Sequence, residues 1–171
     1  YIPYNRLFRR TEFIKVPEYG KFEVYANRDS LKYRKVYQLE DALTIYRGTI
    51  RRVGFSRAWN MFVQLGMTDD SYRMENSADM SYRDFVNSFL PYSPTDSVEL
   101  KMRHNLKIDQ DDIMWEKLEE LDLFNAEKKV GLENATPAEI LQKILMEKWS
   151  LAPEDKDMIV IIFTLYMNRS R

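Results

Sequence analysis

The stretch from Thr44 to Phe55 carries side chains suited to holding negative charge. Arg47, Thr49 and Arg51 occur at every second position there. In an extended strand such side chains share one face at a spacing of ~6.6 Å, so they would form a row ~13 Å long. Each guanidinium can hold a carboxylate through two parallel hydrogen bonds, and the hydroxyl between them can donate another. The row therefore predicts a site for a compound with several carboxylates.

This row has no counter-charge nearby in the sequence. No aspartate or glutamate occurs between Asp41 and Asp69, whereas Arg52 and Arg57 add further guanidinium groups. Gly48 falls on the opposite face of the strand, where a missing side chain lets another backbone or a ligand approach closely. The plainer alternative is a solvent-facing strand whose arginines pair with acids distant in the sequence. The pattern alone leaves both interpretations open.

The composition argues against several other kinds of site. The chain has 171 residues, is 44% hydrophobic and has a formal net charge of -1, so we expect a packed core and no binding of nucleic acid or membrane. It contains no cysteine and one histidine, His104, so we expect no disulfide and no metal site. The five glycines form neither G-x-G-x-x-G nor a P-loop, so no phosphate-binding loop is expected. The absence of cysteine suits a reducing cytosol, and we predict a cytoplasmic protein.

Strand patterns dominate the first third of the chain. Phe13–Val16 and Phe22–Tyr25 flank the turn sequence PEYG, which predicts a hairpin. Leu43–Val53 alternates like a third strand, and the segment before it reads as irregular. After Pro153 the run DMIVIIF is typical of a strand buried on both faces.

Helical signals fill the segment between these strand patterns. Each helix is announced by a capping residue followed by an apolar stripe, and the starts are Ser56 (with Gly66 as the end), Ser81, Ser93, Asp109 and Thr136. The stripes expected to be buried are Trp59/Phe62, Phe85/Phe89 and Leu141/Ile144/Leu145. We therefore predict a sheet domain made of residues 1–55 and 156–171, interrupted by a helical insertion over residues 56–155.

Two stretches give the chain a resemblance to a known family. YANRDSL at residues 25–31, followed by YRGTIRRVGF at residues 46–55, resembles the saccharopine dehydrogenase family, specifically its glutamate-forming saccharopine reductase branch. Members of that branch carry an N-R-D-S stretch and then R-G-T-hydrophobic-R at the same separation. The resemblance covers roughly residues 20 to 160. The chain differs from the family pattern at Ala26, where relatives often have proline, and in the tail from Ile161.

The resemblance implies a fold and a reaction. The fold is α+β: a mixed β-sheet domain of the glyceraldehyde-3-phosphate-dehydrogenase-like C-terminal type, with an all-helical insertion. The reaction is an NADP-linked condensation of a lysine-derived aldehyde with glutamate, which forms saccharopine. NADP would be bound by a Rossmann domain that this chain lacks, so no cofactor is expected on the chain and the chain alone would be inactive. The family also implies a homodimer through the sheet domain, and the start at Tyr1 rather than Met suggests a fragment of a longer protein.

The resemblance further implies which residues contact substrate. The family positions that match Arg28 and the segment Thr49, Ile50 and Arg51 contact saccharopine, with Asn27 and Arg47 as further candidates and no catalytic residue on this chain. Saccharopine bears three carboxylates, so this implication agrees with the row of arginines. Two alternatives stay open: a relative that makes a carboxylated polyamine such as carboxynorspermidine, and a non-catalytic module that binds a protein through its helices.

Overall fold

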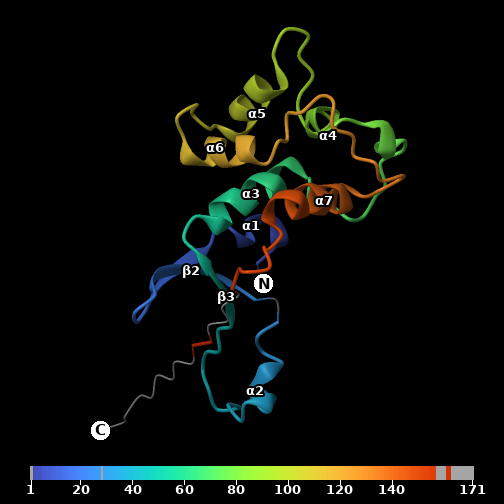
Figure 1. The fold of residues 1–171 in the computed structure, drawn as a ribbon. Coiled ribbons are helices and arrows are strands. Elements are labelled where there is room, and N and C mark those ends of the chain that lie inside the picture. Colours follow the sequence, from blue (N-terminus) through green and yellow to red (C-terminus); the bar gives the residue numbers. More distant parts are fainter. Residues whose placement is uncertain (1, 28, 157–160, 163–171) are drawn as a thin grey trace.

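The computed structural model describes residues 2–27, 29–156 and 161–162, in which a small sheet joins a larger group of helices (Figure 1). The sheet is antiparallel with the strand order β1-β2-β3. Its strands are β1 (Thr11–Val16), β2 (Gly20–Ala26) and β3 (Gly48–Arg52). The helices are α1 (Tyr4–Leu7), α2 (Tyr33–Val36), α3 (Phe55–Leu65), the 3-10 turn η1 (Ser77–Asp79), α4 (Tyr82–Asn87), α5 (Val98–Leu106), α6 (Ile113–Glu120) and α7 (Pro137–Trp149). None of the helices within these described ranges is long and apolar enough to cross a membrane.

The predicted hairpin is confirmed, and the predicted third strand is shorter than expected. β1 and β2 pair from Thr11 opposite Tyr25 to Val16 opposite Gly20. Strand β3 spans Gly48–Arg52 rather than residues 43–53. The paired strands end at Ala26 opposite Gly48, and beyond that pair the hydrogen bond from the Asn27 N–H to the Arg47 carbonyl joins two segments that are no longer strands.

The three described strands run antiparallel, which differs from the mixed sheet expected for this fold class. A mixed sheet would need a parallel neighbour, and the strand predicted from DMIVIIF falls largely outside the described residues. Its two described residues, Ile161 and Ile162, lie in neither a helix nor a strand. The 156–171 part of the predicted sheet domain therefore stays a prediction.

Two of the predicted helix starts are confirmed by complete capping boxes. The Ser81 hydroxyl accepts from the Asp84 backbone N–H while the Asp84 carboxylate accepts from the Ser81 N–H. Thr136 and Glu139 repeat the arrangement at the start of α7, with Pro137 in the first helical position. Such caps use groups within one turn of the chain, which is why the sequence is sufficient to predict them.

Three other helices begin at residues that differ from the predicted starts. α5 is capped by Ser97, because Ser93 and Asp96 bond each other in a turn that precedes the helix. α6 is capped by Asp112 rather than Asp109. Ser56 lies inside the first turn of α3, after Gly54, and caps nothing.

A continuous apolar core lies among the helices. Its buried side chains run from Met61 to Leu145 and include Phe62, Phe85, Leu141, Ile144 and Leu145 from the predicted stripes. Trp59 and Phe89 are only partly buried against it. Helix α3 also reaches the sheet through aromatic contacts, since the ring of its first residue, Phe55, stacks on Tyr25 of β2 with centroids 6.2 Å apart. The orientation of the sheet relative to the helical core is thus set through α3.

Candidate functional site

Thr49 and Arg51 lie on one face of β3. Across the sheet they pair with Tyr25 and Glu23 of β2, and paired residues in an antiparallel sheet point to the same side. Ile50 pairs with Val24 on the opposite face, so it can offer only its backbone to a ligand on the side of Thr49 and Arg51.

Glu23 is a buried acid on this face that the sequence analysis did not single out. Its side chain is 4% exposed. One carboxylate oxygen accepts from the Gly54 N–H at 3.0 Å and the other accepts from the Ser56 N–H. These are free N–H groups at the start of α3, where a negative charge also interacts favourably with the helix dipole. The local feature of the sequence that could have indicated this buried role is the position of Glu23 between the apolar residues Phe22 and Val24 of a strand.

Arg51 is exposed beside this buried carboxylate. Its guanidinium carbon lies 5.2 Å from the centre of the Phe55 ring, and its Nη1 donates to the carbonyl of Ile50 at 3.1 Å. Within the described part of the chain no carboxylate oxygen comes within 4.0 Å of an Arg51 guanidinium nitrogen. The arrangement leaves donors of the guanidinium free to meet an external anion.

The guanidinium of Arg47 packs on an aromatic ring, unlike the exposed guanidinium of Arg51. Arg47 precedes β3, and its guanidinium carbon lies 3.5 Å from the centre of the Tyr33 ring. Its backbone N–H donates to Ser30 Oγ at 3.2 Å and its carbonyl accepts from the Asn27 N–H at 2.7 Å. Of the predicted row, Thr49 and Arg51 lie in β3 itself, whereas the Arg47 guanidinium already has a partner in the Tyr33 ring.

Arg28 lies outside the described residues, but its neighbours in the N-R-D-S stretch are placed. The Asn27 N–H bonds to the carbonyl of Arg47, just before β3. Asp29 Oδ1 accepts from the backbone N–H groups of Leu31 at 3.0 Å and Lys32 at 3.4 Å. The segment on either side of Arg28 is thus tied to the start of β3 and to the turn that leads into α2.

The other arginines of the acid-free stretch point elsewhere. Arg52 lies on the opposite face of β3, with its guanidinium carbon 5.4 Å from the centre of the Phe22 ring. Arg57 on α3 forms an ion pair with Asp112, the cap of α6. For Arg57 the plainer alternative, an acid distant in the sequence, is the correct one.

The space beside Gly48 is filled by the chain itself. A Cβ at this position would lie 2.3 Å from Val24 Cγ1, 3.0 Å from the Tyr25 carbonyl oxygen and 3.2 Å from Tyr46 Cε1. The glycine thus permits a close approach within the sheet, and the approach is made by Val24 rather than by a ligand. Tyr46 is 49% exposed overall, and the partial burial of its phenol, followed by the charge of Glu12, raises the pKa of that phenol.

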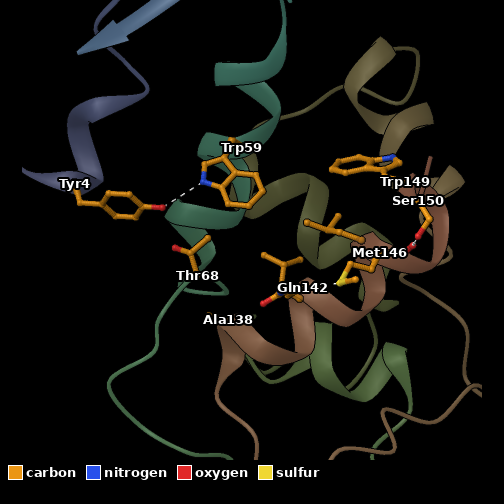
Figure 2. Close-up of a pocket in the computed structure, with 10 residues that line it drawn as sticks. Tyr4, Trp59, Thr68, Ala138, Gln142, Met146, Trp149 and Ser150 are labelled. Carbon is orange, nitrogen blue, oxygen red and sulfur yellow. Dashed lines mark hydrogen bonds between the residues drawn. The ribbon is translucent and has the colours of Figure 1, made fainter. Parts of the chain in front are cut away.

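A hollow of about 530 Å³ lies between α1, α3 and α7, with Trp59 and Trp149 facing the same space (Figure 2). It is lined by Tyr4, Trp59, Thr68, Ala138, Leu141, Gln142, Leu145, Met146, Trp149 and Ser150. This lining contains no charged side chain, so the hollow suits apolar groups and does not match a polycarboxylate. Among the described residues no group of three or more His, Cys, Asp or Glu side chains is placed to hold a metal ion.

Fold and site together define an α+β domain in which a small antiparallel sheet presents arginine beside a separate helical core. The chain belongs to the saccharopine dehydrogenase C-terminal domain family, whose model matches residues 1–171. It is 35% identical over 144 residues to mitochondrial alpha-aminoadipic semialdehyde synthase of Rattus norvegicus, covering 81% of this chain and 15% of that protein. It is 42% identical over 50 residues to saccharopine dehydrogenase [NADP(+), L-glutamate-forming] of Schizosaccharomyces pombe, covering 29% of this chain and 11% of that protein.

A solved structure agrees with the fold. Saccharopine dehydrogenase (L-Glu forming) from Saccharomyces cerevisiae matches with a TM-score of 0.64 and 22% identity, covering 82% of this chain and 32% of that one. The expected family is confirmed, as is an α+β fold with a small sheet and many helices. The chain spans about 15% of the length of its mammalian relatives.

Proposed function

We propose that this chain is the substrate-binding and dimerisation part of a saccharopine dehydrogenase-like oxidoreductase of lysine metabolism. The observation that carries the proposal is the face of β3, where an exposed Arg51 stands beside Thr49 with no carboxylate partner in the described part of the chain. The names of the relatives support it, since those from fungi are L-glutamate-forming saccharopine dehydrogenases that use NADP(+).

The chemistry of saccharopine matches this face. Its three carboxylates require cationic partners, and a guanidinium can hold one of them through two hydrogen bonds. In our proposal Arg51 binds one carboxylate, Thr49 donates a hydroxyl hydrogen bond, the backbone of Ile50 lies alongside, and Arg28, next to Asn27, binds a second carboxylate. The residues on this chain bind and orient the substrate and hold no catalytic group.

In our proposal a Rossmann domain outside this chain would hold the cofactor, whose reduced form, NADPH, would supply the hydride that reduces the imine formed between the lysine-derived aldehyde and glutamate. Titration of the chain with NADPH should accordingly give no tight binding. The sheet domain would form the homodimer contact, as expected for a domain of the glyceraldehyde-3-phosphate-dehydrogenase-like type. Micromolar binding of NADPH would contradict this division of roles.

Calorimetric titration of the purified chain with saccharopine tests the proposed site. Loss of a hydrogen bond to a charged group costs about 1.5–3 kcal/mol, so Arg51→Gln should weaken saccharopine binding at least about tenfold. Arg52→Gln is the matched control, because Arg52 is the next residue of the same strand but lies on the opposite face. Equal losses in the two variants, or no binding by the unmodified chain, would refute the site.

The same titration distinguishes a saccharopine site from the alternative, a site for a carboxylated polyamine. A carboxynorspermidine-like ligand carries amines that need acidic partners, and Glu23, the acid on this face, is buried against α3. We therefore expect saccharopine to bind more tightly than the polyamine. The reverse order would favour the alternative.

A further inference from the structure

The loop of residues 27–47 leaves the sheet between β2 and β3 and extends away from the helical core (Figure 1). Its two ends are joined by the hydrogen bond from the Asn27 N–H to the Arg47 carbonyl, at 2.7 Å. This bond continues the ladder of β2 and β3 by one step beyond the pair Ala26 and Gly48. The base of the loop therefore has the same backbone alignment as the strand that bears Thr49 and Arg51.

Arg47 makes two more contacts, and both reach back into the loop. Its N–H donates to the hydroxyl oxygen of Ser30 at 3.2 Å, and its guanidinium carbon lies 3.5 Å from the centre of the Tyr33 ring. A guanidinium on an aromatic face is held by the attraction between its charge and the ring electrons. Arg47 and Tyr33 are both half-buried, whereas Arg51 is exposed.

The far part of the loop is secured independently of Arg47. Arg34 Nη2 donates to the carbonyls of Ala42 at 2.6 Å and Leu43 at 3.2 Å, which ties α2 to the returning chain. Because Tyr33 is the first residue of α2, its ring is fixed on the same element. The contacts of Arg47 thus connect α2 and the start of the loop to the residue that directly precedes β3.

We infer that Arg47 is a positioning residue and not a ligand contact. Together with Ser30 and Tyr33 it forms a latch that holds Asn27 and Ser30, at either end of the N-R-D-S stretch, at the start of β3. The inference deepens the proposed function and rests on it for the effect on substrate binding. A direct ligand contact by Arg47 requires its guanidinium and not the Tyr33 ring, whereas a latch requires both groups equally.

A double-mutant cycle with two readouts tests the latch. The variants are Arg47→Gln, Tyr33→Leu and the two combined, with Tyr33→Phe as the conservative variant that keeps the ring. The readouts are the hydrogen-exchange rate of the Asn27 amide and the saccharopine affinity of the chain. We expect each single change to raise the exchange rate and weaken binding at least about fivefold, the double variant to add little to either effect, and Tyr33→Phe to behave like the unmodified chain.

Two outcomes would overturn the latch. Weakened binding in Arg47→Gln with unchanged binding in Tyr33→Leu would make Arg47 a ligand contact. An unchanged exchange rate of the Asn27 amide in Tyr33→Leu would refute the latch, whether or not the chain binds saccharopine. A failure of the unmodified chain to bind saccharopine would count against the proposed function and not against the latch. If Tyr33→Leu does not fold, Ser30→Ala decides in its place: it removes the acceptor of the Arg47 N–H, so an unchanged exchange rate at the Arg47 amide would refute the latch.

Discussion

Glu23 and Arg51 face each other across β2 and β3, yet their side chains have different partners. The Glu23 carboxylate accepts hydrogen bonds from the backbone at the start of α3, while the Arg51 guanidinium lies over the ring of Phe55, the first residue of that helix. The acid nearest to Arg51 across the sheet is thus committed to fixing the helix beside it. Arg51 is left exposed on the same face.

The first prediction concerns Glu23 as the cap of α3. Glu23→Ala leaves the N–H groups of Gly54 and Ser56 without their acceptor in a buried place. The expected loss is about 1–3 kcal/mol of the free energy of unfolding, measured by urea denaturation. Glu12→Ala on the neighbouring strand is the control, since Glu12 is exposed and should change the stability by less than about 0.5 kcal/mol. Similar losses in both variants would show that Glu23 has no special role.

The second prediction concerns the close packing at Gly48. Gly48→Ala should destabilise the sheet, because the added methyl group would lie 2.3 Å from Val24 Cγ1. Overpacking of this kind typically costs about 1–3 kcal/mol. The double variant with Val24→Ala removes the clashing atom, so the two losses measured by urea denaturation should sum to more than the loss in the double variant. Simple additivity would contradict the packing explanation.

The third prediction concerns stability in acid through Glu147. The Lys128 ammonium bonds to Glu147 Oε2 at 2.5 Å and the Tyr82 hydroxyl donates to Oε1 at 2.7 Å, and these two bonds, Lys128 first, lower the pKa of the Glu147 carboxyl. A lowered pKa means that the unfolded chain binds the proton more readily. The stabilisation is therefore present above the unfolded pKa of about 4.3 and is lost as the pH falls through the lower folded value.

Melting temperatures measured between neutral pH and pH 3 check this prediction. Glu147→Gln should lower the melting temperature at pH 7 and make its fall in acid shallower than in the unmodified chain. Glu120→Gln serves as the control, because Glu120 forms an exposed pair with Lys117. Identical slopes in the unmodified chain and Glu147→Gln would show that Glu147 does not contribute.

The fourth prediction concerns stability at high pH and the other member of this contact, Tyr82. Burial, followed by the hydrogen bond to Glu147, raises the pKa of Tyr82. The folded chain therefore keeps the phenolic proton longer than the unfolded chain does, so stability is fully present below pH ~10 and falls above it. Tyr82→Phe should make this alkaline fall shallower in a denaturation series from pH 8 to 11. An unchanged slope would indicate that Tyr82 ionises in the folded chain as it does when unfolded.

The fifth prediction concerns Arg28, which lies in the sequence between Asn27 and Asp29, two residues held by hydrogen bonds. If Arg28 holds a substrate carboxylate through two hydrogen bonds, Arg28→Lys should weaken saccharopine binding by ~2 kcal/mol, because lysine cannot copy the fork. The melting temperature should not change. Unchanged affinity with a lower melting temperature would make Arg28 a structural ion-pair partner instead. Arg52→Lys, on the far face of β3, is the control.

Elements that depend on neighbouring residues were predictable from the sequence. The capping boxes at Ser81 and Thr136 are as predicted, because their hydrogen bonds join residues three positions apart. The hairpin is as predicted because its turn, PEYG, sets the first pair, Val16 with Gly20, and the register of the other pairs follows from it. The starts at Ser93 and Asp109 failed because several capping residues stand close together there. Which of them caps was decided by the apolar faces that the helices bury, such as Val98 with Met102 and Trp115 with Leu118.

The candidate site also has features that the sequence predicts and features that only the folded chain determines. Alternation along the strand placed Thr49 and Arg51 on one face, and the sheet register agrees. Only the tertiary structure decided that Arg57 pairs with Asp112, that Arg47 stacks on Tyr33 and that Glu23 caps α3. An arginine in a sequence is a charge on a long flexible stem, and its partner is whichever acid, ring or carbonyl the folded chain brings within reach. For Arg57 and Glu23 that partner lies more than thirty positions away, a separation at which sequence spacing carries no information about contact.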